Sequence, residues 1–333
     1  MSKNVVVVTD SNVRRRLWPK LRRARRHLHE LPEPIVIDAG EQHKNMRTLT
    51  RVHREFLARN LDRNSVVLAL GGGMVTDLAG FAASTWMRGI AWMAAPTTLL
   101  GMVDASIGGK VAVNLGTTKN IVGAFHQPDA VLIGTRALST LPARERRGGL
   151  AEVVKYAMIA DASFFRSLES AGGKLLKAQA SRDAELVTRC ARIKARVVEA
   201  DEKESGQRAM LNFGHTIGHV LETRSRFSLS HGEAVGLGML VACRLAEITG
   251  VAGLAPRQRL SDLLRQWRLP VRLAARIPWS RVWSTLQQDK KTLHGTPRFV
   301  LTPRIGRVSV GHEVPAESIR QALEVIHPGR RVQ

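Results

Sequence analysis

Residues 66–73, Val66-Val67-Leu68-Ala69-Leu70-Gly71-Gly72-Gly73, decide the fold class of this chain. The five apolar residues predict a buried strand, and the three glycines predict a tight turn at its end. Small residues follow Asp77 in Leu78–Ala83 and predict a helix. A strand, a glycine turn and a helix together form a phosphate cradle, because glycine lets the backbone approach closely and the helix N-terminus supplies N–H donors. The loop reads G-G-G-x-x-x-D and not G-x-G-x-x-G, so taken alone it is also compatible with a plain tight turn.

Short apolar segments alternate with helical stretches in the first half of the chain. The expected strands are Val5–Val8, Ile35–Ile37, Val66–Leu70, Ile90–Ala94 and Val131–Ile133. Such alternation predicts a mostly parallel sheet with helices on its faces. Ligands of these sheets bind at the carboxyl ends of the strands. Asp10, Gly71–Gly73 and Thr97-Thr98 all follow strands, so we expect them to gather at one edge.

The pattern changes after Leu141-Pro142, where helical periodicity dominates. The runs Leu175 to Val198 and Ala234 to Thr249 predict long helices, and Phe299–Leu301 and Val308–Val310 predict a hairpin around Pro303 to Arg307. We therefore expect two domains. Residues 1–142 form an α/β nucleotide-binding domain, and residues 143–333 form a mostly helical metal- and substrate-binding domain.

Composition narrows the class of protein. The 333 residues include two cysteines, which provide no disulfide framework or thiolate metal site, and no apolar run long enough to span a membrane. These features predict a cytoplasmic enzyme without a signal peptide. The net charge is +23, and part of it lies in an arginine cluster over residues 14–26. We interpret the cluster as a solvated helix face and expect no specific nucleic-acid partner, since the single tyrosine and sparse aromatic residues do not favour base stacking.

Three histidines and one glutamate have the residue types of a metal site. His215 and His219 are four residues apart, so they share one face of a predicted helix. His231 stands at a predicted helix start, and Glu152 lies on a further predicted helix. Three of these four groups suffice for a catalytic zinc site with an open position, and spacing alone does not choose among them.

Several basic side chains lie among apolar or glycine-rich neighbours, where a cation must be paired or must face an anion. They are Arg88, Lys110, Lys119, Lys155, Lys194, Arg208 and Lys290. A substrate that carries both a phosphate and a carboxylate accounts for so many cations.

With these residues assembled, the chain resembles the 3-dehydroquinate synthase family of sugar-phosphate cyclases over nearly its whole length. The resemblance is densest in Gly71–Asp77, Arg88-Gly89, Pro96–Leu99, Asp104–Lys110, Lys119–Pro128, Leu150–Tyr156, Leu211–His219 and His231–Val235. Two departures, Thr76 in the glycine loop and the linker Leu115–Thr118, fall on no residue with assigned chemistry.

The resemblance implies a Rossmann-like NAD domain followed by a helical domain. The implied reaction is a redox-neutral lyase reaction that converts 3-deoxy-D-arabino-heptulosonate 7-phosphate to 3-dehydroquinate and phosphate in the shikimate pathway. It proceeds by transient oxidation with NAD, phosphate elimination, re-reduction and intramolecular aldol closure. The implied cofactors are NAD and zinc, with cobalt as an alternative metal.

The resemblance also assigns residues. It implies that Glu152, His215 and His231 bind the metal. The implied substrate contacts are Asp104, Lys110, Lys119, Asn120, Lys155, Lys194, Arg208, Asn212, His219 and Lys290. The implied NAD contacts are Asp10, Asn12, Glu41, Lys44, Gly72, Gly73, Val75, Asp77, Thr97, Thr98, Asp104, Lys110, Lys119, Thr140, Leu141 and Glu145. Arg88 is implied to reach the phosphate pocket of a neighbouring subunit, which implies a homodimer.

Three other functions stay open at this point. A sister cyclase that makes a valiolone or an inosose would act on a substrate without the carboxylate, which Lys194 and Arg208 argue against. A metal-dependent alcohol or glycerol dehydrogenase would not use the lysine set. A basic nucleic-acid-binding protein would leave Gly71–Gly73 and the possible metal ligands without a purpose.

Overall fold

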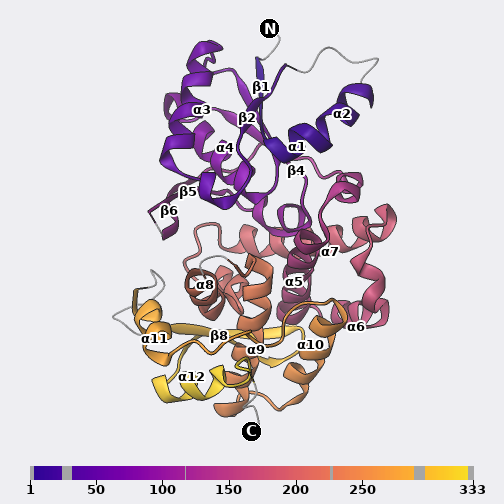
Figure 1. Cartoon of the computed structure of the whole chain (residues 1–333), viewed down its shortest axis with the longest axis vertical. Coiled ribbons are helices and arrows are strands. Elements are labelled where there is room, and N and C mark those ends of the chain that lie inside the picture. The colour runs from indigo at the N-terminus through magenta and orange to yellow at the C-terminus, as the bar shows by residue number, and fades with distance from the viewer. Residues whose placement is uncertain (1–3, 25–31, 117, 226–227, 289–296, 329–333) are drawn as a thin grey trace. The chain divides into compact units, whose positions relative to one another are not determined.

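The computed structural model describes residues 4–24, 32–116, 118–225, 228–288 and 297–328 (Figure 1). The chain divides into two compact units. Unit 1 comprises Met1–Pro142 and Ala178–Ala195, and unit 2 comprises Ala143–Lys177 and Arg196–Gln333. The chain therefore leaves unit 1 after Pro142, returns to it for residues 178–195, and ends in unit 2.

Unit 1 contains a five-stranded parallel sheet with the strand order β2-β1-β3-β4-β7. The strands are β1 (Val5–Asp10), β2 (Ile35–Ile37), β3 (Val66–Gly71), β4 (Ala91–Pro96) and β7 (Ala130–Val131). The α-helices that lie wholly in this unit are α1 (Ser11–Arg16), α2 (Trp18–Ala24), α3 (Met46–Ala58) and α4 (Gly73–Thr85), and unit 1 also contains the first part of α7 (Ala180–Ala200). Four of the five strands fall where the apolar segments predict them, whereas the last ends at Val131 and leaves Leu132 and Ile133 exposed.

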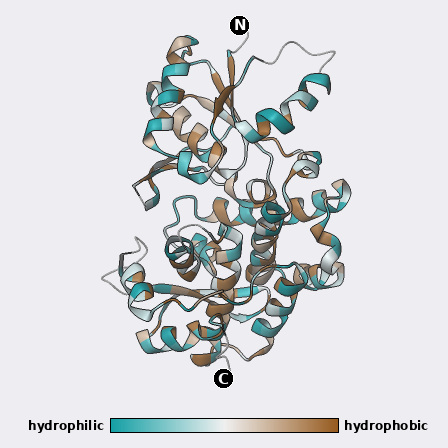
Figure 2. Ribbon diagram, in the orientation of Figure 1, coloured by the Kyte–Doolittle hydropathy of each residue, from teal (hydrophilic) through white to brown (hydrophobic). Residues whose placement is uncertain are grey.

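The core of unit 1 lies between this sheet and helices α3 and α4. Val67 and Ala69 from β3 pack with Val75, Leu78 and neighbouring small residues of α4 in one buried cluster. Figure 2 shows β1 coloured as hydrophobic, whereas α1 and α2 carry hydrophilic surface. Helix α4 can pack this closely because it presents small side chains; a Cβ atom at Gly80 would lie 3.0 Å from the Trp92 ring of β4 and 2.4 Å from a methyl carbon of Val111, which lies outside this sheet.

A β-hairpin in unit 1 follows the glycine-rich stretch after β4. It consists of β5 (Lys110–Leu115) and β6 (Thr118–Phe125), which pair antiparallel. Val111 and Val113 of β5 join the core cluster, and Val122 and Ala124 of β6 pack against it. The hairpin thereby fixes the stretch that carries Lys110, Lys119 and Asn120.

Unit 2 is mostly helical and carries one two-stranded antiparallel sheet, β8 with β9. Its elements are α5 (Ala143–Ala160), α6 (Ala162–Ala171), α8 (His215–Arg224), α9 (His231–Ile248), α10 (Ala255–Gln266), α11 (Trp279–Gln288), β8 (Arg298–Arg304), β9 (Arg307–Glu313) and α12 (Ala316–Leu323). Helix α9 is buried along most of its length, which explains its nearly continuous apolar sequence. Together the two units confirm the expected fold class, an α/β domain followed by a mostly helical one.

Three expected boundaries were wrong. Helix α7 (Ala180–Ala200) begins at Ala180 and not at Leu175, because Gly172–Leu176 form a 3₁₀ helix and the Asp183 carboxylate accepts the Gln179 N–H at 3.0 Å. Helix α9 begins at His231, three residues before the expected start. The strands β8 and β9 extend inward until only Ile305 and Gly306 separate them, and Gly306 takes a positive φ of 85° that suits so short a turn.

No helix among the described residues is long and apolar enough to cross a membrane.

Candidate metal centre and nucleotide site

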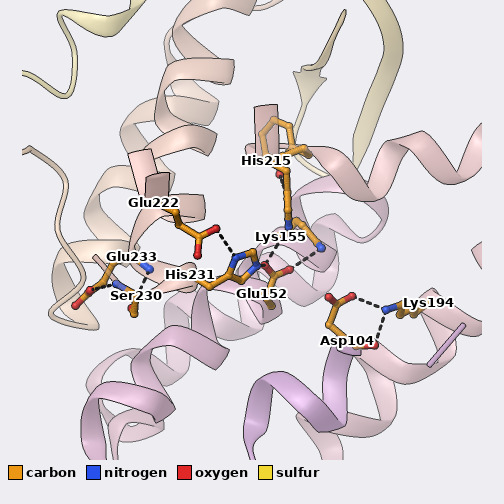
Figure 3. Close-up of polar contacts among 10 residues, drawn as sticks. Asp104, Glu152, Lys155, Lys194, His215, Glu222, Ser230, His231 and Glu233 are labelled. Carbon is orange, nitrogen blue, oxygen red and sulfur yellow. Dashed lines mark hydrogen bonds and ion pairs between the residues drawn. The ribbon is translucent and has the colours of Figure 1, made fainter. Parts of the chain in front are cut away.

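Three side chains of unit 2 converge on one point. Glu152 lies on α5, His215 is the first residue of α8, and His231 is the first residue of α9. Their ligand atoms all lie within 4.8 Å of one another. The Glu152 Oε1 atom is 3.6 Å from His215 Nε2 and 3.3 Å from His231 Nε2. Figure 3 shows the side chains of Glu152, His215 and His231 close together. One carboxylate and two imidazoles in this arrangement match the three-ligand set of a catalytic zinc site.

The far nitrogen of each imidazole has its own acceptor. His215 Nδ1 is 3.2 Å from the backbone oxygen of Phe213. His231 Nδ1 is 3.1 Å from Oε2 of Glu222, a buried carboxylate on α8. Because each Nδ1 has an outward acceptor for its hydrogen, each Nε2 faces Glu152 and is the nitrogen that can bind a metal in place of a proton, as in ligating histidines.

The electrostatics of the site favour a cation. Burial lowers the pKa of His231, but the hydrogen bonds to Glu152 and Glu222 outweigh burial and raise the pKa to about 10. Lys155, one turn after Glu152, places its Nζ 2.5 Å from Glu152 Oε2, and both side chains are almost fully buried. Two carboxylates thus lie against one buried imidazole, and a divalent ion held by Glu152 and the two Nε2 atoms would replace the proton between His231 and Glu152. The residues present therefore fit zinc or a similar metal.

Close contacts between glycines bring the three helices together. A Cβ atom at Gly232, beside His231, would lie 2.2 Å from the backbone oxygen of Gly148, which is one turn before Glu152 on α5. A Cβ atom at Gly238 would lie 2.0 Å from the backbone oxygen of Gly214, which precedes His215. No side chain fits at either crossing, so glycine allows the backbones to pack directly. A capping box between Ser230 and Glu233 then starts α9 at His231.

The remaining residues predicted in unit 2 lie on the same elements as the metal triad or just before them. The His219 ring meets the His215 ring edge to face, with centroids 5.5 Å apart, but His219 is outside the triad. Arg208 is buried on the 3₁₀ turn Gln207–Asn212, and the Asn212 side-chain amide donates to Glu204 at 2.8 Å. Glu145 is in the first turn of α5. Lys290 lies outside the described residues.

The glycine turn of unit 1 forms the expected cradle at the carboxyl edge of the sheet. Helix α4 begins at Gly73 with Gly72 as its N-cap, so the cap residue has no side chain to occupy the first-turn N–H groups. A Cβ atom at Gly72 would lie 3.0 Å from the Thr98 methyl carbon. The Thr97 N–H donates to the Gly71 oxygen and joins the ends of β3 and β4. This bare helix start suits a nucleotide pyrophosphate.

A buried ion-pair network lies at the same edge. Lys44 Nζ is 3.0 Å from both Asp77 Oδ2 and Glu41 Oε1, and the Lys44 side chain is 4% exposed. Burial lowers the pKa of Lys44, but the two carboxylates outweigh it and leave the pKa raised, so the ammonium is charged. Asn114 of β5 donates to Glu41 at 2.9 Å and ties the hairpin to the network.

The predicted substrate contacts of unit 1 lie on α7, on the hairpin β5–β6 and on the turn before it. Lys194 on α7 donates to the Asp104 carboxylate at 2.7 Å and also to the Asp104 backbone oxygen. Asn120 takes a positive φ of 52°, and its N–H donates to the Asn114 side chain. Lys110 begins β5 and Lys119 lies on β6.

The rest of the predicted nucleotide and subunit contacts occupy strand ends and turns. Asp10 ends β1 and caps α1 by accepting from the N–H groups of Asn12 and Val13. The buried side chain of Val75 packs under Gly71, and Thr140 and Leu141 end a 3₁₀ turn. Arg88, which precedes Gly89, is exposed. The φ angle of Arg88 is +69°, a strained conformation for a non-glycine residue.

Some contacts in the site were not predicted. Glu222 and Glu204 each bond a predicted residue, but neither belongs to the sequence motifs with assigned chemistry. A signal for Glu222 exists: it is seven residues after His215 and three after His219, which puts all three on one face of α8.

Comparisons with known proteins agree with this geometry. Family models described as 3-dehydroquinate synthase N-terminal and C-terminal match residues 34–148 and 149–292. The chain is 48% identical to a 3-dehydroquinate synthase of Pelobacter propionicus over 82% of this chain and 76% of that relative. It is 42% identical to a 3-dehydroquinate synthase of a Synechococcus strain over 97% of this chain and 88% of that relative.

Solved structures show the same fold. The 2-epi-5-epi-valiolone synthase of Streptomyces hygroscopicus, solved with NAD+ and Zn2+, has a TM-score of 0.90 and 32% identity, covering 97% of this chain and 90% of that chain. A 2-deoxy-scyllo-inosose synthase, solved with carbaglucose-6-phosphate, NAD+ and Co2+, has a TM-score of 0.86 and 25% identity over 96% and 90%. A probable glycerol dehydrogenase of Sinorhizobium meliloti has a TM-score of 0.65 at 15% identity over 97% and 90%, a likeness of fold alone.

The likeness in sequence and fold to these two synthases, together with the Glu152, His215 and His231 cluster, identifies the chain as a sugar-phosphate cyclase. Within that class, the chain belongs to the 3-dehydroquinate synthase family, whose two models together match residues 34–292.

Proposed function

We propose that this chain converts 3-deoxy-D-arabino-heptulosonate 7-phosphate to 3-dehydroquinate and inorganic phosphate, as a carbon–oxygen lyase of the shikimate pathway. The observation that carries the proposal is the coincidence of the family match over residues 34–292 with the Glu152, His215 and His231 cluster. The product feeds chorismate and aromatic amino acid biosynthesis.

Zinc or cobalt is proposed to bind to Glu152, His215 and His231, and NAD to the cradle at Gly72 and Gly73. When bound, NAD supplies a hydride acceptor and donor, and the metal supplies a Lewis acid that favours the ionised form of a hydroxyl group. The further NAD contacts are proposed from the family motifs: Asp10, Asn12, Glu41, Lys44, Val75, Asp77, Thr97, Thr98, Asp104, Lys110, Lys119, Thr140, Leu141 and Glu145. The Lys44 ion-pair network holds Asp77 and Glu41 in place at that edge.

The chain's own side chains are proposed to bind and orient the substrate. The buried guanidinium of Arg208 can donate two parallel hydrogen bonds to the substrate carboxylate, and the Lys194 ammonium adds a second positive charge. The phosphate contacts are proposed to include His219, Asn212 and Lys155, whose donors suit an anion. The remaining proposed substrate contacts are Asp104, Lys110, Lys119, Asn120 and Lys290.

Two further features rest on the family resemblance. We propose a homodimer in which exposed Arg88 reaches the phosphate pocket of the partner subunit. We also propose a cytoplasmic location, which suits a biosynthetic enzyme with two buried cysteine thiols among the described residues.

A second function is favoured by one observation, the TM-score of 0.90 with a valiolone synthase. Cyclases of that kind act on a sugar phosphate without a carboxylate, so the two proposals differ in what Arg208 and Lys194 recognise.

One experiment separates these functions. The purified full chain is supplied with zinc, catalytic NAD and either the heptulosonate phosphate or sedoheptulose 7-phosphate, which lacks the acid group. We expect phosphate release and dehydroquinate from the first substrate only, with many turnovers per NAD and no lasting NADH absorbance. Equal or better cyclisation of sedoheptulose 7-phosphate would identify a valiolone-type cyclase. Stoichiometric NADH formation from a simple alcohol would identify a dehydrogenase.

A further inference from the structure

Glu222 touches the metal centre without belonging to its ligand set. Glu222 lies on α8 and is only 3% exposed, and its Oε2 atom is 3.1 Å from His231 Nδ1. Figure 3 shows Glu222 and Glu152 on opposite sides of the His231 ring. A buried carboxylate is costly to desolvate, so its position against an imidazole N–H calls for a compensating role.

The hydrogen bond to Glu222 fixes which nitrogen of His231 is available. The carboxylate accepts only from a protonated Nδ1, so Nε2, which faces Glu152 at 3.3 Å, is the nitrogen that can bind a metal in place of its own proton. An imidazole without such a partner can adopt the other tautomer or turn about its side-chain torsions. His215 is held by a neutral backbone oxygen instead.

The two imidazoles therefore differ in the strength of their support. A carboxylate acceptor makes a stronger hydrogen bond than a carbonyl acceptor, and it makes the imidazole a better electron donor. Both histidines are the first residue of their helix, so position in the helix does not distinguish them. The difference between the two ligands lies in the acceptor of Nδ1, a carboxylate for His231 and a backbone oxygen for His215.

From this geometry we propose that Glu222 is a positioning residue that holds His231 in its metal-binding tautomer and orientation, and so sets the affinity of the site for zinc. The inference rests on the proposed metal site and not on which substrate the enzyme takes. Its effect should be on metal binding first, and on turnover only through the metal.

The test uses Glu222→Gln in the full chain, stripped of metal and titrated with Zn2+ against a chelating indicator. Glutamine keeps the size of the side chain but replaces the carboxylate by a neutral amide. We expect zinc affinity to fall roughly 10- to 100-fold, the loss typical of removing a carboxylate behind a ligating histidine. The visible absorption spectrum of the Co2+-loaded variant should also change, because it reports the geometry of the ligands.

A matched control separates positioning from general stability. Glu247 is another almost fully buried carboxylate, on α9, where it bonds Arg244 and Arg257 at 2.7 Å. Glu247→Gln should lower the melting temperature of the metal-free protein but leave zinc affinity and the cobalt spectrum unchanged. Glu222→Asp, which restores the charge, should recover part of the affinity lost in Glu222→Gln.

The results distinguish failure of the role proposed for Glu222 from failure of the proposed metal site. If Glu222→Gln is folded when metal-free and binds zinc within twofold of wild type, Glu222 is not a positioning residue. The same conclusion follows if Glu247→Gln weakens zinc binding as much. If the wild-type chain itself binds no zinc through Glu152, His215 and His231, the proposed metal site is wrong, which is a different failure from that of Glu222.

Discussion

Gly148 and Gly232 bring the backbones of α5 and α9 into direct contact: a Cβ atom added at Gly232 would lie 2.2 Å from the backbone oxygen of Gly148. Glu152 is one turn after Gly148, and His231 is next to Gly232. The distance between two proposed metal ligands thus depends on a crossing at which neither helix carries a side chain.

Gly232→Ala should therefore separate α5 from α9. The obstructing atoms belong to the backbone and cannot move aside, so we expect a loss of about 1–3 kcal/mol or more in the free energy of unfolding, together with weaker zinc binding. Denaturant titration and zinc content measure the two effects. Gly236→Ala on the same helix is the control, because its Cβ atom would meet Leu264 at an ordinary 3.6 Å. Equal behaviour of the two variants would contradict this account of the crossing.

Substitution of the histidines should distinguish ligands from neighbours. His215→Ala and His231→Ala each remove one of three metal-binding groups, so purified protein should lose its stoichiometric zinc. His219→Ala should keep zinc and lose turnover, since its ring lies against His215 but outside the triad. Elemental analysis of the purified variants reports the zinc. Zinc loss in His219→Ala with retention in His231→Ala would reverse the assignment.

Arg208 should determine the preference for a carboxylate substrate. Arg208→Ala removes a buried guanidinium, and by analogy with truncated charge pairs we expect a loss of about 2–4 kcal/mol in transition-state stabilisation. The ratio of kcat/KM for the heptulosonate phosphate in wild type and variant measures it. The KM for NAD should stay unchanged, because NAD is proposed to bind at the cradle of Gly72 and Gly73. An equal rise in the KM for NAD would show that Arg208 does not act on the substrate carboxylate.

Lys44 should contribute more to stability than a surface ion pair. Lys44→Met leaves Asp77 and Glu41 without their cation, and removing one partner of a buried pair costs about 3 kcal/mol. Arg276→Met is the control, because Arg276 and Glu324 are each about half exposed, and such pairs are worth about 1 kcal/mol or less. Urea unfolding of both variants gives the comparison. A smaller loss for Lys44→Met than for Arg276→Met would contradict the expectation.

The Asp201 carboxylate should make the free energy of unfolding depend on pH in the acid range. The carboxylate accepts the backbone N–H groups of Arg208, Ser205 and Gly206, and these bonds lower its pKa from 3.8 to about 2. A lowered pKa in the folded state stabilises the protein above the unfolded pKa, and this stabilisation is lost as pH falls toward 2. The difference in urea midpoint between wild type and Asp201→Asn should be constant from about pH 7 to 5 and shrink below about pH 4. A difference that grows as pH falls would rule out this role.

Much of the fold follows from local sequence. Strands β1 and β3 coincide with apolar runs because residues on both of their faces are buried, so their sequences are nearly continuously apolar. The hairpin β5–β6 was not predicted, since β6 alternates half-buried and exposed residues and includes a glycine where a side chain would strike Val111. The start of α7 depends on a side-chain cap by Asp183, which apolar periodicity does not report.

Only part of the metal site could be predicted from the sequence, because the choice of ligands depends on contacts between helices and not on a pattern within one helix. Spacing along α8 placed His215 and His219 on one face but left the ligand set open, because the choice depends on where α5 and α9 cross α8. Family motifs supplied that choice, and the 4.8 Å cluster agrees with it. The acceptor of His231 comes from a hydrogen bond between two helices, which no pattern within one helix specifies.

The return of residues 178–195 to unit 1 has a consequence for synthesis of the chain. Unit 1 includes the first part of α7, whose Lys194 bonds Asp104. When the ribosome has completed residue 142, that part of α7 does not yet exist, and residues 143–177 of unit 2 are made before it. At translation rates of about 5–20 residues per second, unit 1 waits several seconds for its last segment. A nascent chain halted before residue 178 therefore lacks a segment of unit 1 and leaves Asp104 without Lys194.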